Sequence, residues 1–120
     1  MAYIDGFVVP VPADNKQAYV AMAQKAAPLF QEHGAIRFVE CWGDDVPTGK
    51  VNDFRTAVIA EPNEAVVFSW IEWPDKSTRD AGMAKVMADE RMKPDGDLPF
   101  SGARMIYGGF AAVVDTSASS

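Results

Sequence analysis

The stretch from residue 65 to residue 75, AVVFSWIEWPD, constrains the fold more than any other part of the chain. Its β-branched and aromatic residues favour a β-strand. Alternate side chains of a strand point to opposite faces, which divides the stretch into two sets: Val66, Phe68, Trp70 and Glu72, and Val67, Ser69, Ile71 and Trp73. Because both sets are mostly apolar, we expect a central strand in a sheet that is covered on both faces.

Two long helices are predicted, one before this strand in the sequence and one after it. The first helix should begin at a capping box formed by Asp14 and Gln17 and end at Gly34. Pro28 should kink this helix or break its last turn. Asp75 should cap the second helix, over residues 76–90. That helix has a thin apolar face of small residues and one methionine: Ala81, Ala84, Met87 and Ala88.

Alternating apolar residues and turn signals predict three further strands, over residues 3–11, 35–44 and 104–114, and a short helix over residues 51–60. Pro10 and Pro12 should end the first strand. The order is therefore strand, helix, strand, strand, helix, strand, which is the ferredoxin-like βαββαβ order of an α+β fold. In that topology an antiparallel sheet of order 4-1-3-2 carries both long helices on one face, and the short helix is an insertion between strands 2 and 3. A second copy is the expected cover for the other face, so we predict a homodimer.

Composition limits the partners and the compartment. With 17 acidic and 11 basic residues the net charge is −6, which opposes attraction to nucleic acid or to an anionic membrane, and neither is expected as a partner. The single cysteine cannot form an intramolecular disulfide, and the first residues lack a secretion signal, so we expect a cytoplasmic protein. The 120 residues fit one domain over residues 1–114, followed by a disordered tail over residues 115–120.

Carboxylates among aromatic residues form the best candidate site. Glu40 and Trp42 on strand 2 should lie near Trp70 and Glu72 on strand 3. If they share a face, apolar surroundings would raise the pKa of one carboxyl group and make it a proton donor or acceptor in a small-molecule pocket. Alternatively, both glutamates are solvated or paired with an arginine, and the tryptophans belong to the core or an interface. The candidate ligand-binding residues are Glu40, Trp42, Trp70, Glu72, Arg104 and Tyr107.

Other reactive residues give weaker signals. Cys41 is expected to be a buried, inert thiol, because nothing nearby in the sequence would stabilise a thiolate. His33 lies near the end of the first helix, where its simplest role is to complement the helix dipole. The alternative is that it acts as a general base. One histidine and one cysteine make a transition-metal site hard to assemble, and Ile106 stands where an EF-hand starting at Asp95 would need glutamate. The chain has no phosphate loop or dinucleotide motif, so we predict no metal and no cofactor.

Three segments resemble those of the YbaA-like bacterial family of unknown function: VECWGDDVP at residues 39–47, FSWIEWP at 68–74 and PFSGARMIYGGF at 99–110. The resemblance spans residues 3–114. It implies membership of the dimeric α/β-barrel superfamily, in which two ferredoxin-like subunits pack sheet against sheet, but it supplies no established catalytic residues.

Two function classes stay open. The first is a dimer that binds a small apolar or aromatic molecule, and the chain's 13 Phe, Trp and Tyr residues are its only support. The second is an enzyme acting on a small aromatic metabolite. By fold analogy, superfamily relatives include cofactor-independent monooxygenases and small-molecule isomerases.

Overall fold

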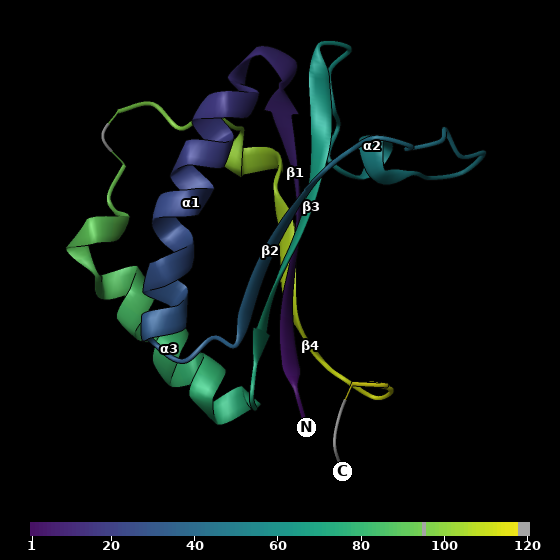
Figure 1. The fold of residues 1–120 in the computed structure, drawn as a ribbon. Helices are drawn as coiled ribbons and strands as arrows, with labels where there is room; N and C mark the ends of the chain where they lie inside the picture. Colours follow the sequence, from purple (N-terminus) through teal and green to yellow (C-terminus); the bar gives the residue numbers. More distant parts are fainter. Residues whose placement is uncertain (95, 118–120) are drawn as a thin grey trace.

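The sheet and its two long helices form two layers in the computed structural model, which describes residues 1–94 and 96–117 (Figure 1). The elements are β1 (Tyr3–Pro12), α1 (Lys16–Glu32), β2 (Arg37–Trp42), α2 (Phe54–Ala57), β3 (Glu64–Trp73), α3 (Lys76–Ala88) and β4 (Ile106–Ala111). Short 3-10 turns, η1 (Ala13–Asn15), η2 (Glu90–Met92) and η3 (Gly102–Arg104), connect them. The strand order is β2-β3-β1-β4 with antiparallel pairing throughout, which confirms the predicted ferredoxin-like sheet.

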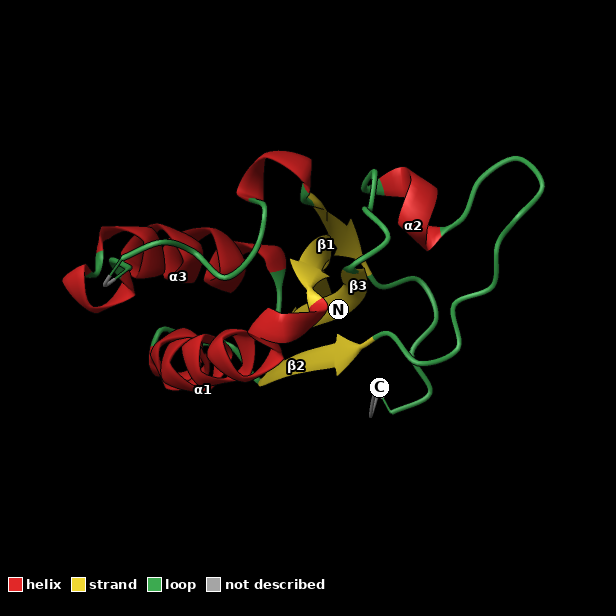
Figure 2. Cartoon of the chain, turned by 90° about the horizontal axis from the view of Figure 1, so that it is seen from above, coloured by secondary structure: helices red, strands yellow, loops and turns green. Residues whose placement is uncertain are grey.

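The strand register sorts the side chains of the sheet into two faces. Three cross-strand rows define the open face, which α1 and α3 do not cover: Ile4 with Glu72 and Phe110, Gly6 with Trp70 and Gly108, and Val8 with Phe68 and Ile106. The intervening residues lie on the helix face, which α1 and α3 cover (Figure 2). The mostly apolar pattern on both sides of β3 therefore reflects one face under helices and one face without them.

The helix face holds most of the core in two clusters. Their buried members are Phe30, Ala35, Ile71, Trp73 and Val86, and Val9, Val11, Tyr19 and Val67. A buried polar group lies among them, because Trp73 Nε1 donates to Asp5 Oδ2 at 2.9 Å. Arg79 of α3 also donates to this carboxylate, and Arg79 Nη2 lies 2.8 Å from Asp5 Oδ1. This network ties α3 to the two central strands.

The insertion between β2 and β3 lies on the opposite side of the sheet from α1 and α3 (Figures 1 and 2). Val58 is 1% exposed and packs with Val8 and Val66 at one end of the open face. The ring of Phe54 meets that of Phe68 edge-on, with centroids 6.0 Å apart. The helix itself covers only four residues, Phe54–Ala57, rather than the predicted 51–60, and Asp53 caps it by accepting from Thr56 N at 2.7 Å.

Two prolines interrupt the structure less than predicted. Pro10 lies inside β1, because its carbonyl faces the side where pairing with β4 has already ended at Val8, and a missing amide hydrogen costs little there. Pro28 lies inside α1, on the exposed side of a helix that continues to Glu32. The prediction that prolines end this strand is therefore confirmed at Pro12, the last residue of β1, but not at Pro10, and the predicted break in the last turn of α1 does not occur.

The ends of the long helices confirm some predictions and correct others. Gly34 has a φ of 114° directly after α1, as expected for a glycine that ends a helix. The capping box at Asp14 does not form, because η1 precedes α1 and Asn15, without a side-chain bond, is the cap. Asp75 caps α3 as predicted, with Thr78 N donating at 2.8 Å.

The remaining predicted bounds differ modestly from the observed ones. β2 and β4 are shorter than the predicted strands over residues 35–44 and 104–114. Gly108 and Gly109, which were expected to interrupt the last strand, both lie within β4. The predicted apolar face of α3 was wrong, because the packed side contains Gly82 and Val86, whereas all four predicted residues are exposed: Ala81, Ala84, Met87 and Ala88. Residues 118–120 of the predicted tail lie outside the described residues. Among the described residues, no helix combines the length and the apolar character needed to cross a membrane.

Candidate functional site

A hollow of about 750 Å³ occupies the middle of the open face. Its lining is apolar or aromatic: Ile4, Gly6, Phe7, Val8, Phe68, Trp70, Ile106, Tyr107, Gly108 and Phe110. Four of these aromatic and aliphatic side chains are unusually exposed: Phe68 at 44%, Ile106 at 45%, Phe110 at 61% and Tyr107 at 73%. Contiguous exposed apolar surface of this kind marks a site of interaction with another molecule.

Two paired glycines belong to the lining of the hollow. Gly6 of β1 lies directly opposite Gly108 of β4, so the backbone there carries no side chains. The ring of Phe110 lies close over this pair, 3.6 Å from the position of a Cβ on Gly6 and 3.4 Å from that of a Cβ on Gly108. The glycines therefore make room for the Phe110 ring, which gives the hollow a flat apolar wall that suits a flat apolar group.

A polar edge borders the hollow where β3 approaches β2. Trp70 Nε1 donates to Glu72 Oε2 at 2.9 Å, and Arg37 Nη1 lies 3.5 Å from the same oxygen. The Glu72 carboxylate is therefore paired, as the alternative interpretation of the sequence expected.

Glu40 lies on the other side of the sheet, under α1. Tyr19 Oη donates to Glu40 Oε1 at 2.7 Å, and Ser69 lies directly across from Glu40 in the register of β2 and β3. Burial raises the pKa of the Glu40 carboxyl group, and the hydrogen bonds from Tyr19 and Ser69 oppose this shift without cancelling it. Burial and the nearby Glu40 also raise the pKa of the Tyr19 phenol.

The register separates the two predicted carboxylates. Glu40 pairs with Ser69 and lies on the helix face, whereas Glu72 pairs with Arg37 and Ile4 and lies on the open face. Trp42 accompanies Glu40, with Lys16 Nζ 5.3 Å from the centroid of its ring, and Trp70 accompanies Glu72. The condition for a shared pocket, both glutamates on one face, is therefore not met. A register shift of one residue exchanges the faces of a strand, and the sequence contains no signal that sets the register of β2 against β3.

Arg104 and Tyr107, the two candidate residues near β4, contact different parts of the structure. Arg104 Nη1 pairs with the buried Glu64 at 2.6 Å and donates to Ile59 O at 2.8 Å, so it stabilises the insertion rather than either candidate glutamate. The Arg104 guanidinium lowers the pKa of the Glu64 carboxyl group. Tyr107 stacks on Phe7 with ring centroids 6.5 Å apart and borders the hollow.

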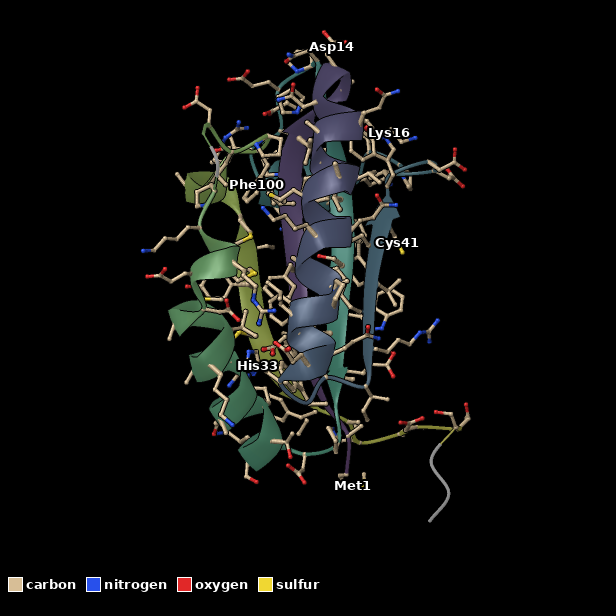
Figure 3. The ribbon with its side chains drawn as sticks, turned by 60° about the vertical axis from the view of Figure 1, so that its left-hand side comes forward. Met1, Asp14, Lys16, His33, Cys41 and Phe100 are labelled. Atoms are coloured by element: carbon tan, nitrogen blue, oxygen red, sulfur yellow. The ribbon has the colours of Figure 1, made fainter. Side chains whose placement is uncertain are left out.

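Cys41 lies on the edge strand β2, and His33 lies at the end of α1 (Figure 3). Cys41 is exposed, and the prediction of a buried thiol was wrong, because β2 is an edge strand and Cys41 lies on the side without helices, opposite Phe68. His33 follows α1 and lies 3.4 Å from Asp89 Oδ2. Glu32, His33 and Asp89 could offer metal ligands within 4.8 Å of one another, but Arg91 already donates to both carboxylates.

A second hollow of about 480 Å³ lies between α1 and residues 91–94 and 96–100. Ala18, Ala21 and Ala26 line it, so the small residues of α1 leave space there. Glu40 is not among the described residues that line this hollow or the hollow on the open face, so neither of them is the predicted cavity over this carboxylate.

Comparisons with known proteins agree on family and fold. Residues 2–102 match the family model described as "Protein of unknown function (DUF1428)". The chain is 65% identical over 116 residues to the uncharacterized protein YbaA of Escherichia coli (strain K12), covering 96% of this chain and 99% of the relative, and the match to YbaA of Shigella flexneri is the same.

Among solved structures, a crystal structure of a dimeric ferredoxin-like protein from an uncultured marine organism gives a TM-score of 0.59 at 9% identity. The match covers 96% of this chain and 99% of that one, and it confirms the fold. The family model and the 65% identity together confirm the resemblance seen in the sequence, and the chain belongs to the DUF1428 family, which includes YbaA and is described as one of unknown function.

Proposed function

We propose that the protein is a homodimer whose two open faces pack together and hold a small apolar or aromatic molecule in the hollow between them. The observation that carries this proposal is the hollow of about 750 Å³ with an apolar lining on the exposed sheet face. A hollow that is open to water in one copy becomes enclosed when a second sheet covers it, and enclosed apolar sites bind small ligands well.

A second copy is the occupant that the open face suits best. Its nine defining residues include one charged side chain, Glu72, which is already paired with Arg37, so a face of the same composition meets no unpaired charge. A two-fold axis brings the same patch of both copies together, which requires this kind of self-compatibility. The marine structure with the same fold is itself described as a dimeric protein, which supports the same arrangement here.

Light scattering at micromolar concentration should give a mass of about 26 kDa, twice the 13.0 kDa of one chain. Phe110→Asp should reduce this mass to that of the monomer, because it places two charges in a desolvated interface without partners. Val20→Asp on the exposed side of α1 is the matched control and should remain dimeric. A wild-type mass near 13 kDa would exclude the dimer.

A second experiment compares variants on the two faces of the sheet and shows which face binds the ligand. We expect a member of a panel of phenols, quinones and small aromatic acids to raise the melting temperature of the wild type. Gly6→Leu, which places a bulky side chain in the lining of the hollow, should abolish this shift, whereas Glu40→Gln on the helix face should preserve it. A shift that survives Gly6→Leu would contradict the assignment to the open face.

A second candidate function, an enzyme acting on a small aromatic metabolite, rests on Glu40. A carboxyl group with a raised pKa beside a phenol is suited to general acid–base chemistry. A ligand-induced shift that is lost in Glu40→Gln and kept in Gly6→Leu would favour this function over the first.

The raised pKa of Glu40 has a consequence for stability. A carboxyl group whose pKa is higher in the folded state than in the unfolded state lowers stability once pH rises through that range, because folding then buries a charge. Glu40→Gln should therefore raise the melting temperature at pH 7, and this gain should shrink below the ordinary pKa of glutamate. Equal melting temperatures at pH 7, or a gain that grows in acid, would contradict this.

A further inference from the structure

We infer that the two copies pack with their strands antiparallel, so that the insertion of each copy closes one end of the other copy's hollow. This inference rests on the proposed homodimer and adds the orientation of the copies and a contribution of the partner to the binding site. The insertion ridge, residues 53–60, is the feature that decides the orientation.

The insertion ridge is raised above one end of the open face and fixed there. Val58 is buried against Val8 and Val66, which belong to the two central strands. Arg55 donates to the carbonyl oxygens of Glu64 and Glu61, both at 2.7 Å. Arg104 donates to the carbonyl oxygen of Ile59 at 2.8 Å. The ridge therefore has several anchors to its own chain and acts as a rigid obstacle to any sheet that approaches this end.

Two packed sheets commonly keep their strand directions within about 30° of each other, and with this alignment two-fold symmetry leaves two ways to stack the open faces. If the strands of the two sheets ran parallel, both ridges would lie at the same end and over the same central strands, so they would collide and hold the two hollows apart. If the strands run antiparallel, each ridge lies beyond the far end of the other sheet. That end carries Ile4 and Phe110, which line the hollow and pair across β1 and β4.

The ridge carries exposed apolar residues that its own chain does not cover. Phe54 is exposed at 48% and Ile59 at 73%. Ile59 also has a φ of 52°, a left-handed backbone conformation that is uncommon for a β-branched residue and that asparagine or glycine adopts with less strain. An exposed isoleucine at a position whose backbone favours a polar residue indicates a contact outside the chain. In the antiparallel dimer, Ile59 and Phe54 meet the apolar end of the partner's open face.

Ile59→Asn separates folding from dimerisation. Asparagine tolerates the backbone conformation, so the melting temperature of the monomer, measured in the Phe110→Asp background, should not fall. The dissociation constant of the otherwise wild-type dimer should rise at least about tenfold, as expected when a central apolar contact is lost. Met87→Asn, at an exposed apolar residue of α3, should leave the dissociation constant unchanged. A dimer as tight in Ile59→Asn as in the wild type would overturn the inference.

Energy transfer between labelled copies tests the orientation directly. Single cysteines replace Val51 beside the ridge or Val113 beyond β4 in a Cys41→Ser background, and donor-labelled copies are mixed with acceptor-labelled copies. The antiparallel dimer predicts stronger transfer from Val51 to Val113 than from Val51 to Val51. The reverse order would overturn the inference and leave the homodimer intact, whereas a monomeric wild type would overturn both.

Discussion

Arg79→Ala is expected to lower the free energy of unfolding by about 3 kcal/mol, because it leaves a buried carboxylate without its cation. Asp5 is 3% exposed and accepts from Arg79 Nη2 at 2.8 Å. Trp73 Nε1 would remain as a donor, but a neutral donor cannot replace a guanidinium. Urea titration at fixed protein concentration and neutral pH measures the change.

Two controls identify the cause of this loss. Lys76→Ala removes another cation of α3, one that pairs with Asp80 at the surface, and should change stability little. Adding Asp5→Asn to Arg79→Ala should recover part of the loss, because the unpaired charge is then removed. If the double variant is as unstable as the sum of the two single variants, the buried charge is not the reason for the loss.

Gly82→Ala is expected to destabilise the protein by about 2 kcal/mol, although alanine is the better helix former by about 1 kcal/mol. A Cβ at residue 82 would lie 2.6 Å from Cζ3 of Trp73 and closer still to the backbone oxygen of His33. Trp73 is completely buried and cannot move aside, so α3 would have to shift away from both the sheet and α1.

Gly102→Ala is the matched control for this prediction. Its Cβ would make only an ordinary contact, 3.9 Å from the ring of Phe100, and stability should stay within about 0.5 kcal/mol of the wild type. Thermal and urea unfolding of both variants provide the comparison. A Gly82→Ala protein more stable than the wild type would show that helix propensity outweighs packing at this site.

Local patterns in the sequence were sufficient to predict the order of the elements, the α+β class and the sheet order. They succeeded because strand and helix periodicities depend on residues a few positions apart, and because Gly34 and Asp75 end or begin helices through bonds within one turn. The apolar character of both sides of β3 also indicated, from sequence alone, that one face would lack helices.

The tertiary structure decided what the candidate site contains. Glu40 and Glu72 lie on opposite faces because of the register between β2 and β3, and a shift of one residue would have reversed this without any change in local pattern. The Phe110 ring lies close to the sheet because Gly6 meets Gly108, a residue about a hundred positions away in the chain, and no local signal pairs them. Which side chains line a site thus depends on contacts between distant segments, whereas the kinds of element that carry them were already determined by the sequence.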